Sequence, residues 1–231
     1  MRRTVNYIRV GYSSVSYNMW TLCQAIRDKS LSELIDTLKD KLAEDDDASF
    51  EGSPSRGRHG IWQLGLNQFS RRYIYHLLAR LTSYTEAGSG KPDLFDKYID
   101  RTVKNPFDIE HIWPDDFDRY AAEYPTRQDF DEWRNNVAGL LLLAADVNRS
   151  YQDKAFEKKA PHYAKQNLYA ASLTPTAYQH QPQFQSFTTT QRLPFRSYEH
   201  FGKHEQEERS ALVLALANKI WSPERLEEYR P

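Results

Sequence analysis

The sequence predicts a mostly helical α+β fold. Long segments with apolar residues at helical spacing lie toward both ends of the chain, and two short apolar segments lie near its centre. Of the 231 residues, 39% are hydrophobic and 27% are charged, which is ample material for a buried core. We expect one compact unit, in which a helical region, residues 1–100, packs on a second region, residues 101–231, that ends in a helix.

The first expected helix is KSLSELIDTLKDKL, residues 29–42. Ser30 and Glu33 have the spacing of an N-terminal capping box, and Leu and Ile recur along one face. Residues 44–60 are rich in Asp, Gly, Ser and Pro, so they predict a loop.

Three further helices are expected. The first begins near Asn67, the second is the short segment 93–101, and the third covers residues 205–221 before Pro223. The apolar face expected for the first of them consists of Phe69, Tyr73, His76, Leu77 and Leu81.

The two central segments are expected to differ from these helices. Asn105-Pro106 disfavours helix and Pro114 ends the segment NPFDIEHIWP, which predicts a strand. The run VAGLLLLAADVN, residues 137–148, suits either a buried strand or the start of a buried helix. Residues 172–200 are rich in Gln, Thr and Pro and predict an irregular surface loop.

Charge and cysteine content narrow the class of protein. The net charge is −1, so a nucleic-acid partner would need a local basic patch. Cys23 is the only cysteine, which excludes an internal disulfide framework and a multi-cysteine zinc site. No apolar run approaches the roughly 18 residues of a membrane span, and the N-terminus lacks the apolar region of a secretory signal. We therefore expect a soluble, cytoplasmic protein.

The predicted strand carries the most reactive side chains. Strand alternation places Asp108 and Glu110 on one face and His111 on the other. A neutral imidazole is a competent general base near pH 7, and carboxylate oxygens are common ligands of hard divalent cations. The pattern alone fits either a metal and general-base site or a structural polar pair.

A basic segment follows the second apolar run. Between Arg149 and Lys165 five basic residues stand against two acidic ones. Such a segment is suited to hold a DNA phosphate backbone without reading sequence, although a solvated helix face has the same composition. The candidate phosphate contacts are Arg149, Lys154, Lys158 and Lys159.

Two motifs resemble a known family. EHIWP, residues 110–114, resembles the first motif of the HNH, or ββα-metal, endonucleases. Residues 140–159 resemble the second strand and helix of one branch, the C-terminal nuclease half of GmrSD-type modification-dependent restriction proteins. The residues that fit its pattern are Leu140, Leu142, Leu143, Asn148, Phe156 and Lys159.

The resemblance implies a ββα-metal core embedded in helices and a metal-dependent DNA endonuclease of a restriction or phage-defence system. It implies that His111 is the general base, that Glu110 and Asn148 are the metal ligands, and that Asp108 orients a metal-bound water or His111. The expected ion is Mg²⁺, with Mn²⁺ as the alternative.

One position departs from the family pattern. The residue before Leu140 is Gly139, where the family has an Asn that helps to hold the histidine. Asn135 and Asn136 are the nearby candidates to replace this amide. Without a replacement, the alternative is a weakened or inactive domain that binds nucleic acid or protein.

The resemblance also implies partners. DNA is the expected substrate, and an N-terminal NTPase and sensor half is expected in the same or a partner chain. This chain contains no GxxxxGK[ST] phosphate-binding loop, so nucleotide hydrolysis and the choice of modified DNA are expected to lie outside it.

Overall fold

The computed structural model describes residues 12–46, 50–52, 60–149 and 154–231. The chain divides into two compact units, one of residues 62–216 and one of residues 1–61 with 217–231. The boundary expected near residue 100 lies inside the larger unit. None of the helices in the described ranges is long and apolar enough to cross a lipid bilayer.

The smaller unit contains α2 (Tyr12–Ile26), α3 (Leu31–Asp46) and the 3-10 helix η4 (Pro223–Tyr229). The predicted capping box at α3 is confirmed, because Glu33 Oε2 accepts the Ser30 N–H at 2.9 Å and the Ser30 hydroxyl at 2.6 Å. Ion pairs from Lys39 to Glu227 and from Arg230 to Asp36 join α3 to η4. The predicted loop after α3 falls largely on residues outside the described ranges.

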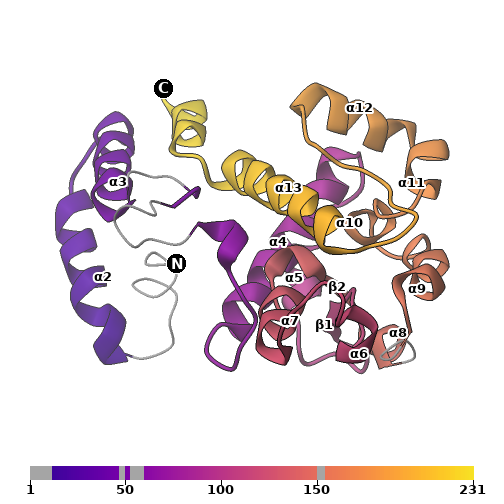
Figure 1. The fold of residues 1–231 in the computed structure, drawn as a ribbon. Helices are drawn as coiled ribbons and strands as arrows, with labels where there is room; N and C mark the ends of the chain where they lie inside the picture. Colours follow the sequence, from indigo (N-terminus) through magenta and orange to yellow (C-terminus); the bar gives the residue numbers. More distant parts are fainter. Residues whose placement is uncertain (1–11, 47–49, 53–59, 150–153) are drawn as a thin grey trace. The chain divides into compact units, whose positions relative to one another are not determined.

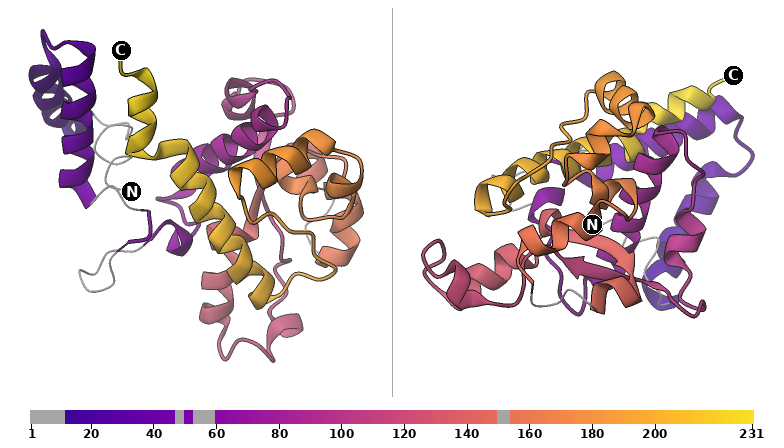
Figure 2. Two further views of the ribbon diagram at one scale, coloured as in Figure 1. Left: turned by 90° about the horizontal axis from the view of Figure 1, so that it is seen from above. Right: turned by 90° about the vertical axis from the view of Figure 1, so that its right-hand side faces the viewer.

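The larger unit is built around a two-stranded antiparallel sheet, and the mostly helical α+β prediction is confirmed (Figures 1 and 2). Strand β1 (Phe107–His111) pairs with β2 (Leu140–Ala144), so that Phe107 lies opposite Ala144 and His111 opposite Leu140. Leu140 to Leu143 are completely buried on both faces of β2, which explains why this segment is apolar without alternation.

The apolar run after Gly139, for which the sequence left a strand and a helix start as alternatives, contains both. It forms strand β2 and then passes directly into the short helix α8 (Ala145–Arg149). Helix α4 (Arg71–Gly88) packs against β2, and α8 contacts both strands. The order strand, strand, helix therefore places Asn148 beside β1.

The apolar face predicted for the first helix of this unit is wrong in part. Asn67 Oδ1 accepts the backbone N–H groups of Phe69 and Ser70, so α4 begins at Arg71 and Phe69 stays 77% exposed before it. The face that α4 buries includes Ile74, Tyr75, Leu78, Ala79, Leu81 and Thr82.

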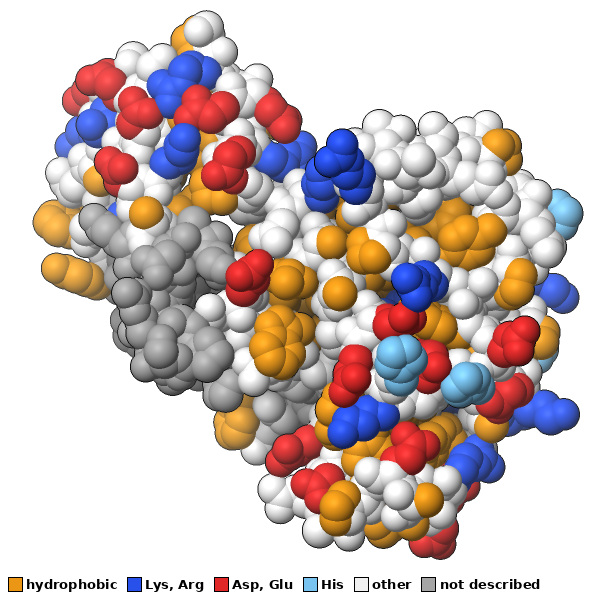
Figure 3. All heavy atoms as spheres, turned by 45° about the horizontal axis from the view of Figure 1, so that its top comes forward, with side chains coloured by type: hydrophobic (Ala, Val, Ile, Leu, Met, Phe, Trp, Pro, Cys, Tyr) orange, Lys and Arg blue, Asp and Glu red, His pale blue; other side chains and the backbone are white. Residues whose placement is uncertain are grey.

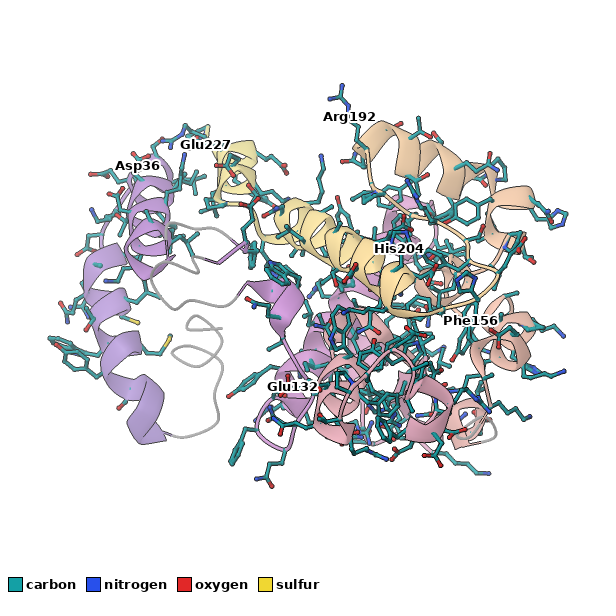
Figure 4. All side chains as sticks on the ribbon, viewed as in Figure 1. Asp36, Glu132, Phe156, Arg192, His204 and Glu227 are labelled. Atoms are coloured by element: carbon teal, nitrogen blue, oxygen red, sulfur yellow. The ribbon has the colours of Figure 1, made fainter. Side chains whose placement is uncertain are left out.

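The remaining described elements of the chain are helical. They are η2 (Ile61–Gln63), α5 (Phe95–Ile99), α6 (Phe117–Tyr120), α7 (Arg127–Arg134), η3 (Val137–Gly139), α9 (Phe156–Tyr163), α10 (Leu168–Ala171), α11 (Thr176–Gln179), α12 (Pro182–Gln191) and α13 (Lys203–Trp221). Phe156 of α9 points into a crowded interior, whereas Arg192 projects outward after α12 (Figure 4). The strand and helices predicted for residues 93–114 and 205–221 are confirmed.

The surface loop predicted for residues 172–200 is wrong. Helices α11 and α12 occupy much of this range, and Phe184, Phe187 and Leu193 are buried. Phenylalanines three residues apart supply the buried face of α12, while its Gln and Thr residues face outward. Composition suggested a loop because so few apolar residues anchor this helix.

Side chains cap the open edges of the sheet. On the outer edge of β1, Tyr75 Oη donates to the Phe107 carbonyl at 3.1 Å and Asn148 Nδ2 to the Ile109 carbonyl at 3.0 Å. On the outer edge of β2, Asn167 Nδ2 donates to the Leu142 carbonyl at 2.8 Å. These bonds satisfy backbone acceptors that strand pairing leaves open.

Candidate functional site

His111 ends β1 and is held by Asn135. The two residues come from separate elements, since Asn135 is the C-terminal cap of α7. His111 Nε2 lies 3.0 Å from Asn135 Oδ1. An amide oxygen only accepts, so Nε2 carries the proton and Nδ1 keeps its lone pair. The half-buried imidazole is thereby fixed in the tautomer that leaves Nδ1 to accept a proton.

The surroundings keep His111 neutral. The pKa of His111 is lowered to about 4 by burial first and by the positive charges of Arg134, Lys159 and Arg71 next, while the bond to Asn135 opposes this shift. The base form is therefore present throughout the neutral range. The same cations make this position favourable for an anion.

Glu110 lies in a closed environment. Its side chain is 3% exposed and that of Lys159 is 1% exposed. Glu110 Oε1 accepts from Lys159 Nζ at 2.8 Å and from Tyr163 Oη at 2.8 Å. Burial, followed by the Glu110 charge, holds the pKa of Tyr163 well above its usual range, so Tyr163 remains a neutral donor.

Lys159 has a second acceptor at the site. Its ammonium group donates to the backbone carbonyl of His111 at 2.8 Å. Because Lys159 is completely buried, it is not the surface phosphate contact that the sequence suggested. Lys154 and Lys158 are exposed, as a phosphate contact requires. The face in Figure 3 shows acidic and basic side chains interspersed, in agreement with the net charge of −1.

Asp108 lies at the opposite end of β1 from His111 and is only partly buried. Its Oδ1 accepts from Arg71 Nη2 at 2.9 Å and from the Ile109 N–H at 3.0 Å. The carboxylate thereby brings Arg71, at the start of α4, to the strand that carries His111.

Asn148 presents an oxygen next to the same strand. Its Nδ2 donates to the Ile109 carbonyl, so the amide is oriented and Oδ1 is the atom left for another partner. Within the described ranges no three His, Cys, Asp or Glu residues cluster as a metal site. One amide oxygen and a β1 carboxylate nevertheless fit a hard cation such as Mg²⁺, which keeps several waters and takes few protein ligands.

The two candidate replacements for an amide at Gly139 have separate roles. Asn135 contacts His111, whereas Asn136 caps η3 by accepting the Ala138 N–H at 2.9 Å and donates to the Trp62 carbonyl at 2.7 Å. Asn136 is thus structural, and Asn135 serves the histidine.

Sequence reasoning missed Arg71, Arg134 and Tyr163 as neighbours of the site. Arg134 is half-buried, and its Nε donates to the Pro114 carbonyl at 3.3 Å. Its position directly before Asn135 was the signal in the sequence. Arg71 and Tyr163 come from helices whose packing against β1 the sequence did not reveal.

Comparison with protein families places most of the larger unit in one of them. Residues 61–214, about two thirds of the chain, match the C-terminal domain of GmrSD restriction endonucleases. No curated protein and no solved structure matches the chain. The resemblance inferred from EHIWP and residues 140–159 is confirmed. The chain belongs to the family of C-terminal domains of GmrSD restriction endonucleases.

Proposed function

We propose that this domain hydrolyses phosphodiester bonds in DNA with His111 as the general base of an HNH-type site. The observation that carries the proposal is the bond between His111 Nε2 and Asn135 Oδ1, which leaves Nδ1 free to accept a proton. The neutral state of His111 and the cations around it also suit a base that acts beside a phosphate.

In this mechanism Nδ1 of His111 takes a proton from the attacking water. Without substrate, burial and nearby cations disfavour the imidazolium. A bound phosphate brings negative charge next to those cations and favours the protonated ring. Substrate binding would therefore strengthen the base that acts on it.

Arg134 and Arg71 are the proposed cations for the scissile phosphate. Arg134 forms no ion pair with any described residue, and its Nε bond to Pro114 fixes the guanidinium beside the loop that follows β1. A planar guanidinium can bind phosphate through two parallel bonds. Arg149, Lys154 and Lys158 are proposed to hold the DNA backbone farther along.

A divalent metal ion, Mg²⁺ or Mn²⁺, is proposed to bind Asn148 Oδ1 and a carboxylate of β1. Glu110 is the proposed carboxylate ligand; Lys159 and Tyr163 occupy its Oε1, which leaves Oε2 for a cation. Asp108, which holds Arg71 at the strand, is proposed to orient a metal-bound water. When bound, such an ion stabilises negative charge on the scissile phosphate and on the leaving oxygen.

The cellular role is proposed to be restriction or phage defence in the cytoplasm. The family consists of C-terminal domains, so we propose that an NTPase and sensor half, in the same or a partner chain, selects the modified DNA.

Supercoiled plasmid tests the function. The chain is incubated with plasmid and Mg²⁺, Mn²⁺ or EDTA, and nicked and linear products are quantified. We expect cleavage with metal that falls by about 10²–10⁴-fold in His111→Ala. His204→Ala is the matched control, since His204 is 77% exposed on α13.

Two results would contradict the proposal. Equal cleavage by the chain and by His111→Ala would exclude His111 as the base. DNA binding without cleavage under any metal condition would support a catalytically inactive binding domain instead.

A further inference from the structure

The start of α13 and the residues just before it contact the segment that carries His111 and the segment that carries Asn135. Trp113, two residues after His111, donates its Nε1–H to the Phe201 carbonyl at 2.6 Å. Gln206, in the first turn of α13, donates its Nε2–H to the Trp133 carbonyl at 2.6 Å. Trp133 stands two residues before Asn135. The chain around residues 201–206 therefore connects the two segments that supply the His111–Asn135 contact.

The amide side chain of Gln206 is completely buried. It has no exposed surface, and its Oε1 finds no hydrogen-bond partner among the described residues. An unpaired buried amide oxygen is energetically unfavourable. Because a buried side chain with an unpaired oxygen is unfavourable, its presence indicates that the Gln206 amide is needed at this position.

Gly139 provides the space for this amide. A Cβ built on Gly139 would lie 3.1 Å from Gln206 Oε1, 3.3 Å from Cδ and 3.4 Å from Nε2. Gly139 also accepts the Ile112 N–H through its carbonyl at 2.9 Å, so the backbone there is fixed to the residue that follows His111. The backbone at Gly139 cannot move away without disturbing this bond beside the strand pair, so a Cβ at residue 139 would push against the amide.

The bond to Trp133 is made where α7 ends. The last carbonyls of a helix have no partner within the helix, and Gln206 together with the Asn136 N–H satisfies this one. Asn135 lies between Trp133 and Asn136, so these two bonds fix its backbone on either side.

We propose that Gln206 is a positioning residue for His111. From the first turn of α13 its amide fixes the end of α7, and Asn135 is thereby held against His111 Nε2. The same amide lies tightly against the position that a Cβ of residue 139 would take. The catalytic consequence rests on the proposed function, whereas the effect on the His111–Asn135 bond does not.

Four variants test the proposal: Gln206→Ala, Gly139→Ala, the double variant, and Gln128→Ala as control. Gln128 lies on the exposed side of α7, and among the described residues its side chain bonds only to Glu132. For each variant, long-range ¹H–¹⁵N NMR of the metal-free protein reports the tautomer of His111. Plasmid cleavage gives kcat and KM, and thermal unfolding gives Tm.

Gln206→Ala is expected to change His111 from a single Nε2–H tautomer to a mixture and to lower kcat by about 10–100-fold. KM should change by less than about threefold, because no phosphate contact is lost. Gly139→Ala should have the same effects to a smaller extent, since its methyl group pushes against the amide at 3.1–3.4 Å. The double variant should resemble Gln206→Ala rather than add the two losses. Gln128→Ala should match the unmodified chain.

The proposal is overturned if Gln206→Ala lowers Tm but leaves the tautomer and kcat unchanged, or if Gly139→Ala changes nothing. If Gln206→Ala does not fold, Gln206→Met keeps the volume without the donor and must give the tautomer mixture. If the unmodified chain cleaves no DNA, a tautomer change in the variants still supports the role of Gln206, and only the nuclease assignment fails.

Discussion

Glu110 and His111 are neighbours in sequence, yet they lie in opposite kinds of environment. Glu110 is buried with Lys159 and Tyr163, where its charge is balanced and Oε1 accepts two bonds. His111 is half-buried beside Asn135, close to Arg134, which forms no ion pair with any described residue. One residue along a strand separates a buried carboxylate that is paired with an ammonium group from a half-buried neutral imidazole.

Adjacent side chains of β1 therefore have different roles, one in stability and one in reactivity. A buried ion pair is destabilising to break, because the partner that remains is left charged in a dry interior. Such a pair suits the fixed side of a site. A neutral base close to Arg134 suits the side that receives an anionic substrate.

Breaking the buried Glu110–Lys159 pair should have the largest effect, a loss of stability. Lys159→Met leaves the Glu110 carboxylate buried with Tyr163 alone, so the free energy of unfolding should fall by about 3–5 kcal/mol. Lys158→Met, the exposed neighbour, should change it by less than about 0.5 kcal/mol. Denaturant titration of both variants makes the comparison, and equal losses would show that the Glu110–Lys159 pair is not structural.

The next largest effect is expected on catalysis, when Asn135, the partner of His111, is replaced. Asn135→Ala removes the acceptor for His111 Nε2–H and should lower kcat by about 10²-fold with little loss of stability. Asn135→Asp keeps an acceptor and should retain more activity than the alanine variant. Steady-state cleavage of plasmid measures both, and an alanine variant with full kcat would remove Asn135 from the mechanism.

A smaller effect is expected at Arg134. Arg134→Gln removes a cation from the phosphate position, so KM should rise by about tenfold. Arg127→Gln is the control on the same helix, because Arg127 already pairs with Asp115 and Asp131. Cleavage rates over a range of DNA concentrations measure the change. A larger rise for Arg127→Gln would place the phosphate elsewhere.

The smallest effect is a pH dependence of stability in the metal-free protein. The pKa of His111 is about 4 in the folded chain, below its ordinary value of 6.5, so the unfolded chain binds this proton more readily between those values. The stability linked to neutral His111 is therefore complete above about pH 6.5 and is lost as the pH falls to about 4.

His111→Gln checks this dependence. Its free energy of unfolding should fall less than that of the unmodified chain between about pH 7 and pH 4. Parallel curves for the two proteins would show that His111 is not shifted.

The sequence predicted the backbone of the site better than its contacts. Asn105-Pro106 and Pro114 set the bounds of β1, and the capping box at Ser30 set the start of α3, because these signals act locally. Lys159 was placed on the surface because a lysine after a helix start is usually solvated. Only the packing of α9 against β1 shows that Glu110 neutralises it.

Gly139 illustrates the same limit. From the sequence it is an amide missing from a motif. In the structure Asn135 contacts the histidine and Gln206 fills the space beside the glycine. Residues 135 and 206 are far apart in sequence, so their joint role depends on how α7 and α13 pack, which no local pattern encodes.

The capped edges of the sheet have a consequence for association. An exposed strand edge is a template on which another chain can add a strand, either as a ligand or in aggregation. Here Tyr75, Asn148, Lys159 and Asn167 already occupy carbonyls on the two edges. Another strand can add at these edges only by displacing those side chains, so the residues that order the site also protect it from edge-to-edge self-assembly.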